Sequence, residues 1–264
     1  MTGGIGVDVH FDCTQCGFCC RNTKIPLTAA EAVDWLTDGN QVQLICEARP
    51  WREEPPADDP QAAHMKRRSF VAASGAMPVR VVASLVANIP GDCPNLLPDM
   101  RCGIYERRPL VCVIYPAEIN PVIALQPSKK ACPSAAWDSH HPLLMRGGAV
   151  MNEATRAAIQ RWRSTDALEA DLKGRVCAAL SIGEAALAQE GFVVYSPPID
   201  TLLGALSRAL QCAGAPAPDG QWRFVTNRSE TAGDLSRQGA VAVQAHGRGD
   251  PRYQYIGFKP ASPA

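Results

Sequence analysis

The chain has 264 residues, of which 46% are hydrophobic and 20% charged, an ordinary globular composition that excludes wholesale disorder. Lys plus Arg and Asp plus Glu each number 26, so no overall positive charge is available to bind nucleic acid or an anionic membrane. The length predicts one or two domains. The unusual number is the cysteine count of 11.

The N-terminal segment lacks the positive charges and apolar stretch of a secretion signal. No run of the sequence approaches the roughly 18 apolar residues of a membrane span. We therefore expect a cytoplasmic protein with no membrane partner and no nucleic-acid partner, in which thiols stay reduced. In such a chain, grouped cysteines indicate metal ligands or a redox site rather than disulfides.

The first half of the sequence predicts a few regular elements. Thr28 and Glu31 form the T-x-x-E pattern of a capping box, which predicts a helix that ends near Gly39. Two stretches rich in β-branched residues, 69–73 and 79–86, predict a β-hairpin. The segment that follows them is irregular and rich in proline, as expected where a metal replaces a hydrophobic core.

The second half is predicted to be helical and then strand-rich. Apolar residues at four-residue intervals over 168–180 predict an amphipathic helix, and leucines over 202–210 predict another. Ser181 and Glu184 repeat the capping pattern, which predicts a short helix ending near Gly191. Strand-like stretches follow at 221–226, 240–245 and 253–258.

These elements predict a mixed α+β fold, with a loop-rich cysteine module, helices and a small antiparallel sheet. We expect a cysteine-cluster metal-binding domain over residues 1–145. Residues 146–264 are expected to form a second region, helical and then strand-rich, whose role the sequence leaves open.

Four cysteines lie in the run Cys13-Thr-Gln-Cys16-Gly-Phe-Cys19-Cys20. A C-x-x-C turn brings two sulfurs to one side of a tight loop, at a separation that one metal ion can span. Gly17 permits the backbone conformation that such turns often need. The spacing of the first three cysteines occurs both in zinc sites and in [4Fe–4S] sites, so it does not choose between them.

Four further cysteines are spread over forty residues, at Cys93, Cys102, Cys112 and Cys132, as if they reached a site from separate loops. Thiolate-rich sites select zinc, iron–sulfur clusters or Cu(I). Eight thiolates exceed the four that one zinc ion or one cubane cluster uses, and adjacent Cys19 and Cys20 are expected to point in different directions. The pattern thus indicates two centres, or one centre with additional structural or redox cysteines. Fortuitously close cysteines and a disulfide knot are the competing interpretations.

Several other residues are weaker candidates. Cations near the cysteines would stabilise a negatively charged thiolate centre, and Arg108 is the favoured one among them. A surface role is favoured for His140 and His141, and packing around the site is favoured over chemistry for Tyr105 and Tyr115. The remaining cysteines are expected to be buried apolar residues, with Cys46 the least clear; they are Cys46, Cys177 and Cys212. No nucleotide-binding loop, zinc-protease helix or serine-hydrolase motif occurs.

Three segments carry a resemblance to a known family. The run Cys13–Cys20, the block Cys102-Gly-Ile-Tyr-Glu-Arg-Arg-Pro-Leu-Val-Cys112 and the tripeptide Ala-Cys132-Pro resemble the YkgJ-type cysteine-cluster family, described as zinc- or iron-chelating, over residues 11–135. The resemblance implies metal ligation by eight shared cysteines: Cys13, Cys16, Cys19, Cys20, Cys93, Cys102, Cys112 and Cys132. It also implies that Tyr105, Arg108 and Pro109 belong to a shared I-Y-E-x-R-P element. We expect Tyr105 and Arg108 to contact the cofactor. The chain departs from the family at Val113, where members commonly carry arginine.

The family's cysteine cluster is similar to that of flagellin lysine N-methylases, which are linked to an iron–sulfur centre. We therefore expect a cysteine-ligated metal protein, with an iron–sulfur cluster favoured slightly over zinc. One alternative is a cluster-dependent group-transfer enzyme, such as a protein lysine N-methylase. Another is a metal-sensing or metal-delivery module that acts through a protein partner. Whether the chain is an enzyme is left open by its sequence.

Overall fold

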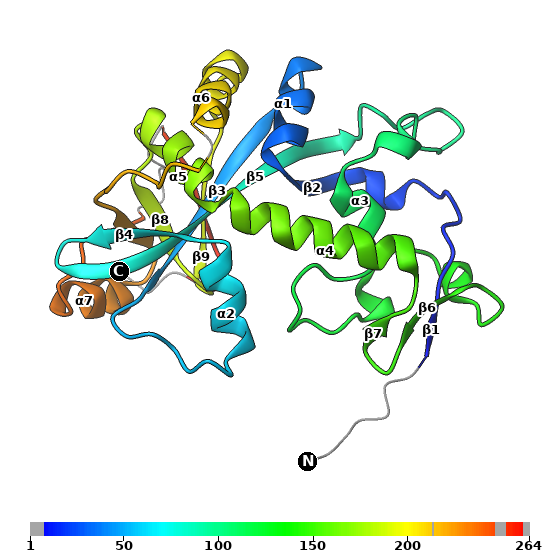
Figure 1. Ribbon diagram of the computed structural model, residues 1–264, viewed down its shortest axis with the longest axis horizontal. Helices are drawn as coiled ribbons and strands as arrows, with labels where there is room; N and C mark the ends of the chain where they lie inside the picture. Colours follow the sequence, from blue (N-terminus) through cyan, green and yellow to red (C-terminus); the bar gives the residue numbers. More distant parts are fainter. Residues whose placement is uncertain (1–7, 213, 246–251, 261–264) are drawn as a thin grey trace. The chain divides into compact units, whose positions relative to one another are not determined.

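The computed structural model describes residues 8–212, 214–245 and 252–260 (Figure 1). Contacts divide the chain into two units, each made of two separate stretches. The first unit comprises Met1–Ile25 and Asn88–Ser164, and the second comprises Pro26–Ala87 and Thr165–Ala264. The domain boundary expected after residue 145 falls inside the first unit. Residues 1–7, on which the expectation about secretion partly rests, lie outside the described residues.

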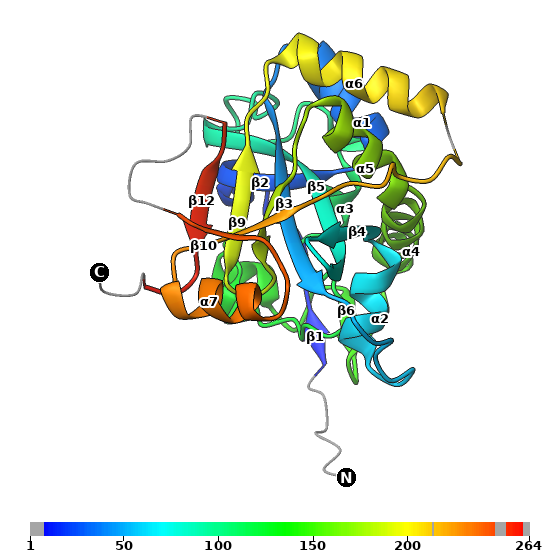
Figure 2. The same cartoon turned by 90° about the vertical axis from the view of Figure 1, so that its left-hand side faces the viewer.

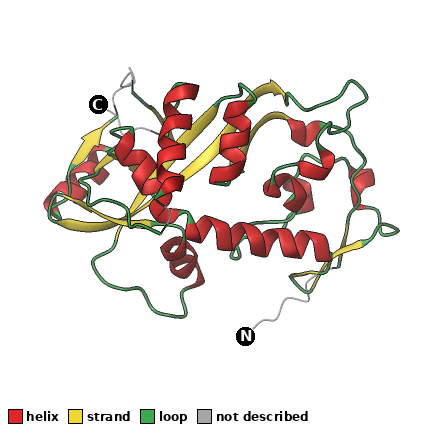
Figure 3. Cartoon of the chain, turned by 45° about the horizontal axis from the view of Figure 1, so that its top comes forward, coloured by secondary structure: helices red, strands yellow, loops and turns green. Residues whose placement is uncertain are grey.

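The first unit is a loop-rich module whose elements, apart from the long helix α4, are short (Figure 3). Its strands β1, β6 and β7 form a small antiparallel sheet. The elements that lie in this unit or begin in it are β1 (Val9–His10), the 3-10 helix Phe18–Cys20, β2 (Arg21–Leu27), the 3-10 helix Tyr105–Arg107, α3 (Leu110–Ile114), the 3-10 helices Pro127–Lys129 and Ser134–Trp137, β6 (Leu143–Arg146), β7 (Ala149–Val150) and α4 (Glu153–Leu168). With the helices and sheets of the second unit, they confirm the predicted α+β fold.

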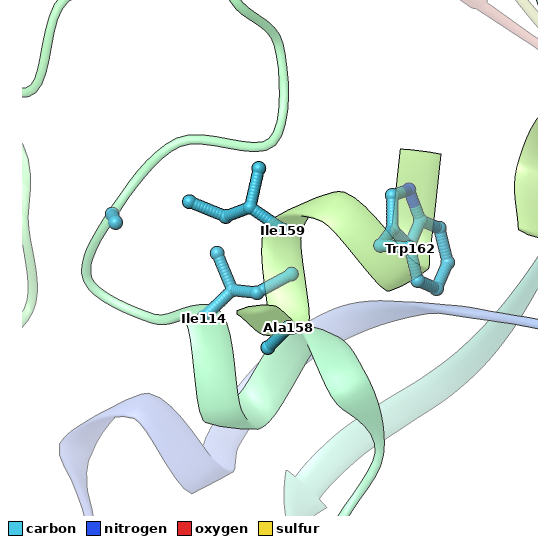
Figure 4. Packing of buried hydrophobic residues seen from close by; sticks show 5 residues of the cluster. Ile114, Ala158, Ile159 and Trp162 are labelled. Carbon is cyan, nitrogen blue, oxygen red and sulfur yellow. The ribbon is translucent and has the colours of Figure 1, made fainter. Parts of the chain in front are cut away.

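The hydrophobic core of the first unit is small and forms where α3 meets α4 (Figure 4). Ile114 from α3 packs against Ala158, Ile159 and Trp162 from α4. The three α4 residues share one helix face because they recur at intervals of three and four. So small a core leaves the long cysteine-bearing loops dependent on other interactions for their order.

The second unit is built on a large mixed sheet covered by helices. The path of the nine-stranded sheet runs β11-β10-β8-β3-β5-β2, with β4 beside β5 and β9 between β3 and β12 (Figure 2). Its elements are α1 (Ala29–Thr37), β3 (Val42–Pro50), α2 (Pro60–Arg67), β4 (Phe70–Ser74), β5 (Met77–Asp92), α5 (Ala170–Ala179), β8 (Glu184–Leu187), β9 (Gly191–Tyr195), α6 (Ile199–Gln211), β10 (Arg223–Thr226), α7 (Ser229–Arg237), β11 (Ala242–Gln244) and β12 (Gln254–Gly257). Three of its helices, α1, α5 and α6, pack together.

Elements with strong local signals are confirmed. Thr28 caps α1 through the predicted capping box: its side chain accepts from the Glu31 N–H while the Glu31 carboxylate accepts from the Thr28 N–H. Gly39 follows the helix at φ +79°, a conformation that glycine adopts without steric cost. The hairpin is β4 with β5, closed where Ser74 pairs with Met77. The predicted helix over 202–210 lies within α6.

The predicted helix opening at Ser181 is wrong, because Glu184–Leu187 is strand β8. Tertiary contacts outweigh the local capping pattern here. The strand lies between β3 and β10, where the Glu184 carboxylate accepts a 2.8 Å hydrogen bond from the Tyr195 hydroxyl and pairs with Arg223. The two alanines that follow Glu184 are completely buried in the sheet. The strand-like stretches near the C-terminus are also strands, but β8, β10 and β11 run parallel.

A buried ion network links α4, α5 and α2 in the second unit. Lys173 is 2% exposed, and its Nζ lies 2.6 Å from Asp166 Oδ1 and 3.4 Å from Glu169 Oε2. Burial disfavours the charged form of Asp166, yet Lys173 and Arg68 hold the pKa of this carboxyl below its ordinary value. The ion pairs of Asp166 therefore stabilise the folded chain at neutral pH, and their contribution is lost as the pH falls from about 3.9 through the lowered pKa of this carboxyl.

Replacing Lys173 by methionine is expected to lower the free energy of unfolding by about 3–5 kcal/mol, because it leaves buried carboxylates without their cation. Urea unfolding followed by circular dichroism would measure the loss. Arg146→Gln is the control, since its pair with Asp8 is exposed to solvent and is worth less than about 1 kcal/mol. Equal, small effects of the two variants would contradict a stabilising role for the network.

Candidate metal centre

The first cysteine loop is held against the segment that carries Cys93. Gly17 has φ +70°, a conformation that favours glycine, and it packs against the end of the Met100 side chain. The Cys93 N–H donates a 2.8 Å hydrogen bond to the Cys20 carbonyl oxygen. Cys102 in turn forms an isolated antiparallel bridge with Leu96. Backbone contacts thus bring Cys20, Cys93 and Cys102 to the same place.

The segment that carries Cys132 also contacts the first cysteine loop. The Asp12 N–H donates to the Ala136 carbonyl oxygen at 3.0 Å, which ties the first cysteine loop to the segment after Cys132. The Tyr115 hydroxyl accepts from the Ala131 N–H at 2.9 Å and also hydrogen-bonds the Cys132 thiol. Tyr115 was predicted to pack around the site, and this hydrogen bond gives it a direct part in positioning Cys132.

Cys132 lies within electrostatic range of Cys13, Cys16 and Cys19, and these four residues are here called the first quartet. Burial raises the pKa of the Cys132 thiol, the hydrogen bond from Tyr115 opposes this, and the charges of Cys16 and Cys13 raise it further. The hydrogen bond with Cys20 lowers the pKa of Cys19. Burial opposes that effect, as do the charges of three neighbours: Cys132, Cys13 and Cys112.

Cys20, Cys93, Cys102 and Cys112 form a second quartet. Burial raises the pKa of Cys112 to about 12, and the other three members add to the effect while Arg108 opposes it. Burial also raises the pKa of Cys93, and the charges of Cys20 and Cys102 raise it further. A hydrogen bond from the Asn95 backbone lowers the pKa of Cys93 and so opposes these effects. The protonated thiols of Cys93 and Cys112 are therefore favoured at neutral pH, and binding a metal ion would displace their protons.

The two quartets meet at the adjacent residues Cys19 and Cys20. Their Sγ atoms lie 3.9 Å apart on the 3-10 helix Phe18–Cys20, so the expectation that these side chains point in different directions is wrong. The hydrogen bond between them raises the pKa of Cys20 and lowers that of Cys19. Two thiolates at this distance would repel each other unless cations are bound close to both.

The donor set fits zinc or iron, while its geometry is not that of a closed site. Cysteine thiolates are the ligands that zinc and iron–sulfur clusters prefer. Within residues 8–212, 214–245 and 252–260, however, no three cysteine, histidine, aspartate or glutamate side chains are positioned to share one metal ion. Loading the centre therefore requires the gathered thiols to reorient. Most of them lie in irregular loops, which permit such movement, whereas Cys19 and Cys20 lie on a 3-10 helix and Cys112 lies in α3.

A cavity of about 300 Å³ lies beside the first quartet, within the first unit. Four segments line it: residues 11–19, the Tyr105–Pro116 region, residues 132–144 and the start of α4. All four members of the first quartet border it, whereas Cys112 is its one lining residue from the second quartet. The start of α4 carries no motif, so only the folded chain identifies Asn152 and Thr155 as lining residues.

Arg108 connects the second quartet with this cavity. Its Cζ lies 3.9 Å from the centroid of the Tyr105 ring, and it lines the cavity together with Tyr105. Its charge lowers the pKa values of Cys20 and Cys112 against the stronger effects that raise them. Val113, which stands where the resembled family commonly has arginine, presents an apolar wall to the same cavity.

The weaker candidates are distributed elsewhere. Arg101 forms a 2.7 Å hydrogen bond with Asp99 on the surface, and His140 is exposed beside Asp138. Cys46 and Cys177 are completely buried in the second unit, where their thiols hydrogen-bond each other. Cys212 is exposed at the C-terminal cap of α6, so the expectation that it is buried is wrong. The leucine spacing of α6 continues only to Leu210, which is itself 40% exposed.

None of the helices in the described part of the chain is both long and apolar enough to cross a membrane. No curated protein and no solved structure matches the chain. A family model does match residues 12–133; its description reads "Putative zinc- or iron-chelating domain". The match spans the segments that carry both quartets, which confirms the predicted resemblance. Residues 12–133, somewhat less than half of this chain, are therefore similar to the CxxCxxCC family of zinc- or iron-chelating domains.

Proposed function

We propose that this protein binds two metal centres, a [4Fe–4S] cluster on the first quartet and a structural zinc ion on the second. The observation that supports the proposal is that Cys132 lies near Cys13, Cys16 and Cys19, while Cys112 lies near Cys20, Cys93 and Cys102. Each quartet has the number of thiolates that one such centre uses. A reducing compartment such as the cytoplasm suits these free thiols.

Ligand spacing supports iron–sulfur binding by the first quartet. Cys13, Cys16 and Cys19 have the C-x-x-C-x-x-C spacing of ferredoxin ligands. Ferredoxins complete such a cluster with a remote cysteine that precedes proline, and Cys132 precedes Pro133. When bound, the cluster would supply one-electron chemistry beside the cavity.

Position supports a structural role for the second quartet. Cys20, Cys93 and Cys102 do not line the cavity, and backbone contacts hold them where two loops meet. Closed four-cysteine sites in such loops stabilise folds because the metal replaces missing core contacts. Arg108 is positioned to offset the negative charge of four thiolates on one ion.

A cluster-dependent group-transfer enzyme is the second candidate function, and the cavity favours it. A structural centre needs no adjoining cavity, whereas a reactive centre needs room for a substrate. The first quartet has this room, since all four of its members line the cavity.

Anaerobic purification followed by metal, sulfide and visible-absorption measurements tests the proposal. We expect a brown protein with about four irons, four acid-labile sulfides and one zinc per chain. A colourless protein with about two zinc ions per chain would show that the first quartet binds zinc instead of a [4Fe–4S] cluster. Carefully handled protein without bound metal would refute metal binding by both quartets.

A further inference from the structure

We propose that the cavity beside the first quartet binds a small organic carboxylate, with the Arg108 guanidinium as its anchor. This inference goes beyond metal binding, because the site is made by side chains that are present with or without a metal. It assigns a ligand class to a cavity for which the family description gives none.

The size and lining of the cavity suit a small ligand with an apolar body. Its 300 Å³ correspond to about ten water molecules, at the lower end of the range for ligand sites. Much of its wall is apolar, from Phe11, Val113, Pro116, Leu143 and Leu144. A ligand made only of polar groups would leave this wall without complementary contacts.

The Arg108 guanidinium has a buried donor without an acceptor, and a carboxylate oxygen would provide that acceptor. Its Nε is buried and has no hydrogen-bond partner, although buried guanidinium donors are normally paired. Stacking on the Tyr105 ring holds the planar guanidinium in place. A carboxylate accepts two parallel hydrogen bonds from such a fork, and little side-chain freedom remains to be lost on binding.

The charges around the cavity favour one negative charge over several. Among the described residues that line it, Arg108 carries the one cationic side chain and Asp12 the one carboxylate. Asp12 Oδ1 accepts from the Cys13 N–H, and Asn152 Oδ1 accepts from the Thr155 N–H, so these two oxygens are already engaged. A multiply charged phosphate would meet one cation and an opposing carboxylate, whereas a monocarboxylate is matched by Arg108.

A cysteine thiolate is the competing acceptor for Arg108. The charge of Arg108 lowers the pKa values of Cys20 and Cys112, so a thiolate of the metal-loaded second quartet could also accept a hydrogen bond from the Arg108 Nε–H. The two explanations differ in whether a carboxylate binds. The test therefore uses the full chain in two states, treated with chelator and loaded with metal.

Benzoate is the probe, benzamide is its uncharged isostere, and ligand-observed NMR and calorimetry measure binding. We expect benzoate to bind in the millimolar range in both states, at least tenfold more tightly than benzamide. Arg108→Gln should remove this preference in the chelator-treated protein, where metal binding plays no part in the measurement. Arg107→Gln is the matched control, because Arg107 is exposed on the same 3-10 turn and should leave binding unaltered.

Three results would overturn the carboxylate site: equal affinities for benzoate and benzamide, full benzoate binding by Arg108→Gln, or Arg108-dependent binding of inorganic phosphate without benzoate. If Arg108→Gln does not fold, Arg108→Lys decides, because it keeps the charge but loses the fork and should reduce the benzoate preference at least fivefold. The metal assays alone test whether the protein binds metal. The chelator-treated protein tests the carboxylate site in the absence of metal, so the two proposals can fail independently.

Discussion

Replacing Cys16 by serine is expected to abolish the brown chromophore and nearly all bound iron while zinc stays near one per chain. Cys16 belongs to the first quartet and lines the cavity, away from the contacts that hold Cys20, Cys93 and Cys102 together. A cubane cluster that loses one of four thiolates is held far less tightly. Metal analysis and visible absorption of the variant, purified without oxygen, measure this result.

Cys102→Ser should give a different pattern, because Cys102 belongs to the second quartet. We expect loss of zinc and a drop of roughly 10 °C or more in the melting temperature, since a structural metal contributes folding free energy directly. Iron should fall as well, because the loop that carries Cys20 also carries the first quartet. Calorimetry together with metal analysis would show both effects.

Cys212→Ser is the matched control for both variants, because Cys212 is an exposed cysteine in the second unit. It should leave iron, zinc and the melting temperature unchanged. If Cys16→Ser and Cys102→Ser instead lose both metals in equal proportion, the eight cysteines hold one shared centre. If neither variant loses metal, these two cysteines are not ligands.

Removing the metals with a chelator is expected to raise amide hydrogen exchange at least tenfold in residues 11–25 and 88–137. These segments carry both quartets, and the small core between α3 and α4 includes few of their residues. Without metal, only backbone hydrogen bonds connect the cysteine loops, because the metal–thiolate bonds that would reinforce them are absent. Hydrogen exchange followed by mass spectrometry would locate the change.

The second unit provides the internal control for this experiment. Strand β3 pairs with β5 along its whole length, and Leu44, Cys46 and Ala48 on its inner face are at most 1% exposed. Its exchange should remain slow after chelation. Equal loss of protection in β3 would show that the metals stabilise the whole chain, and unchanged exchange in both units would show that they do not order the cysteine loops.

The chemistry of the metal centre could be predicted from the sequence because it depends on residue type and short spacing. Three cysteines in C-x-x-C-x-x-C spacing predict a metal-ligand loop from local sequence alone, whatever the position of that loop in the fold. The capping box of Thr28 with Glu31 is likewise local, since both residues lie within one helical turn. The predicted resemblance rests on the same kind of short, ordered pattern and is confirmed by the family model.

Long-range contacts decided the rest. The same capping pattern at Ser181 and Glu184 gave way to strand β8, because Tyr195 and Arg223 bind the Glu184 carboxylate within a sheet. Cys132 lies near Cys13 and Cys16 although more than one hundred residues separate them, so no spacing rule could group them. Residue type determined which atoms can bind a metal, but their grouping and the cavity beside them depend on contacts between segments that only the folded chain brings together.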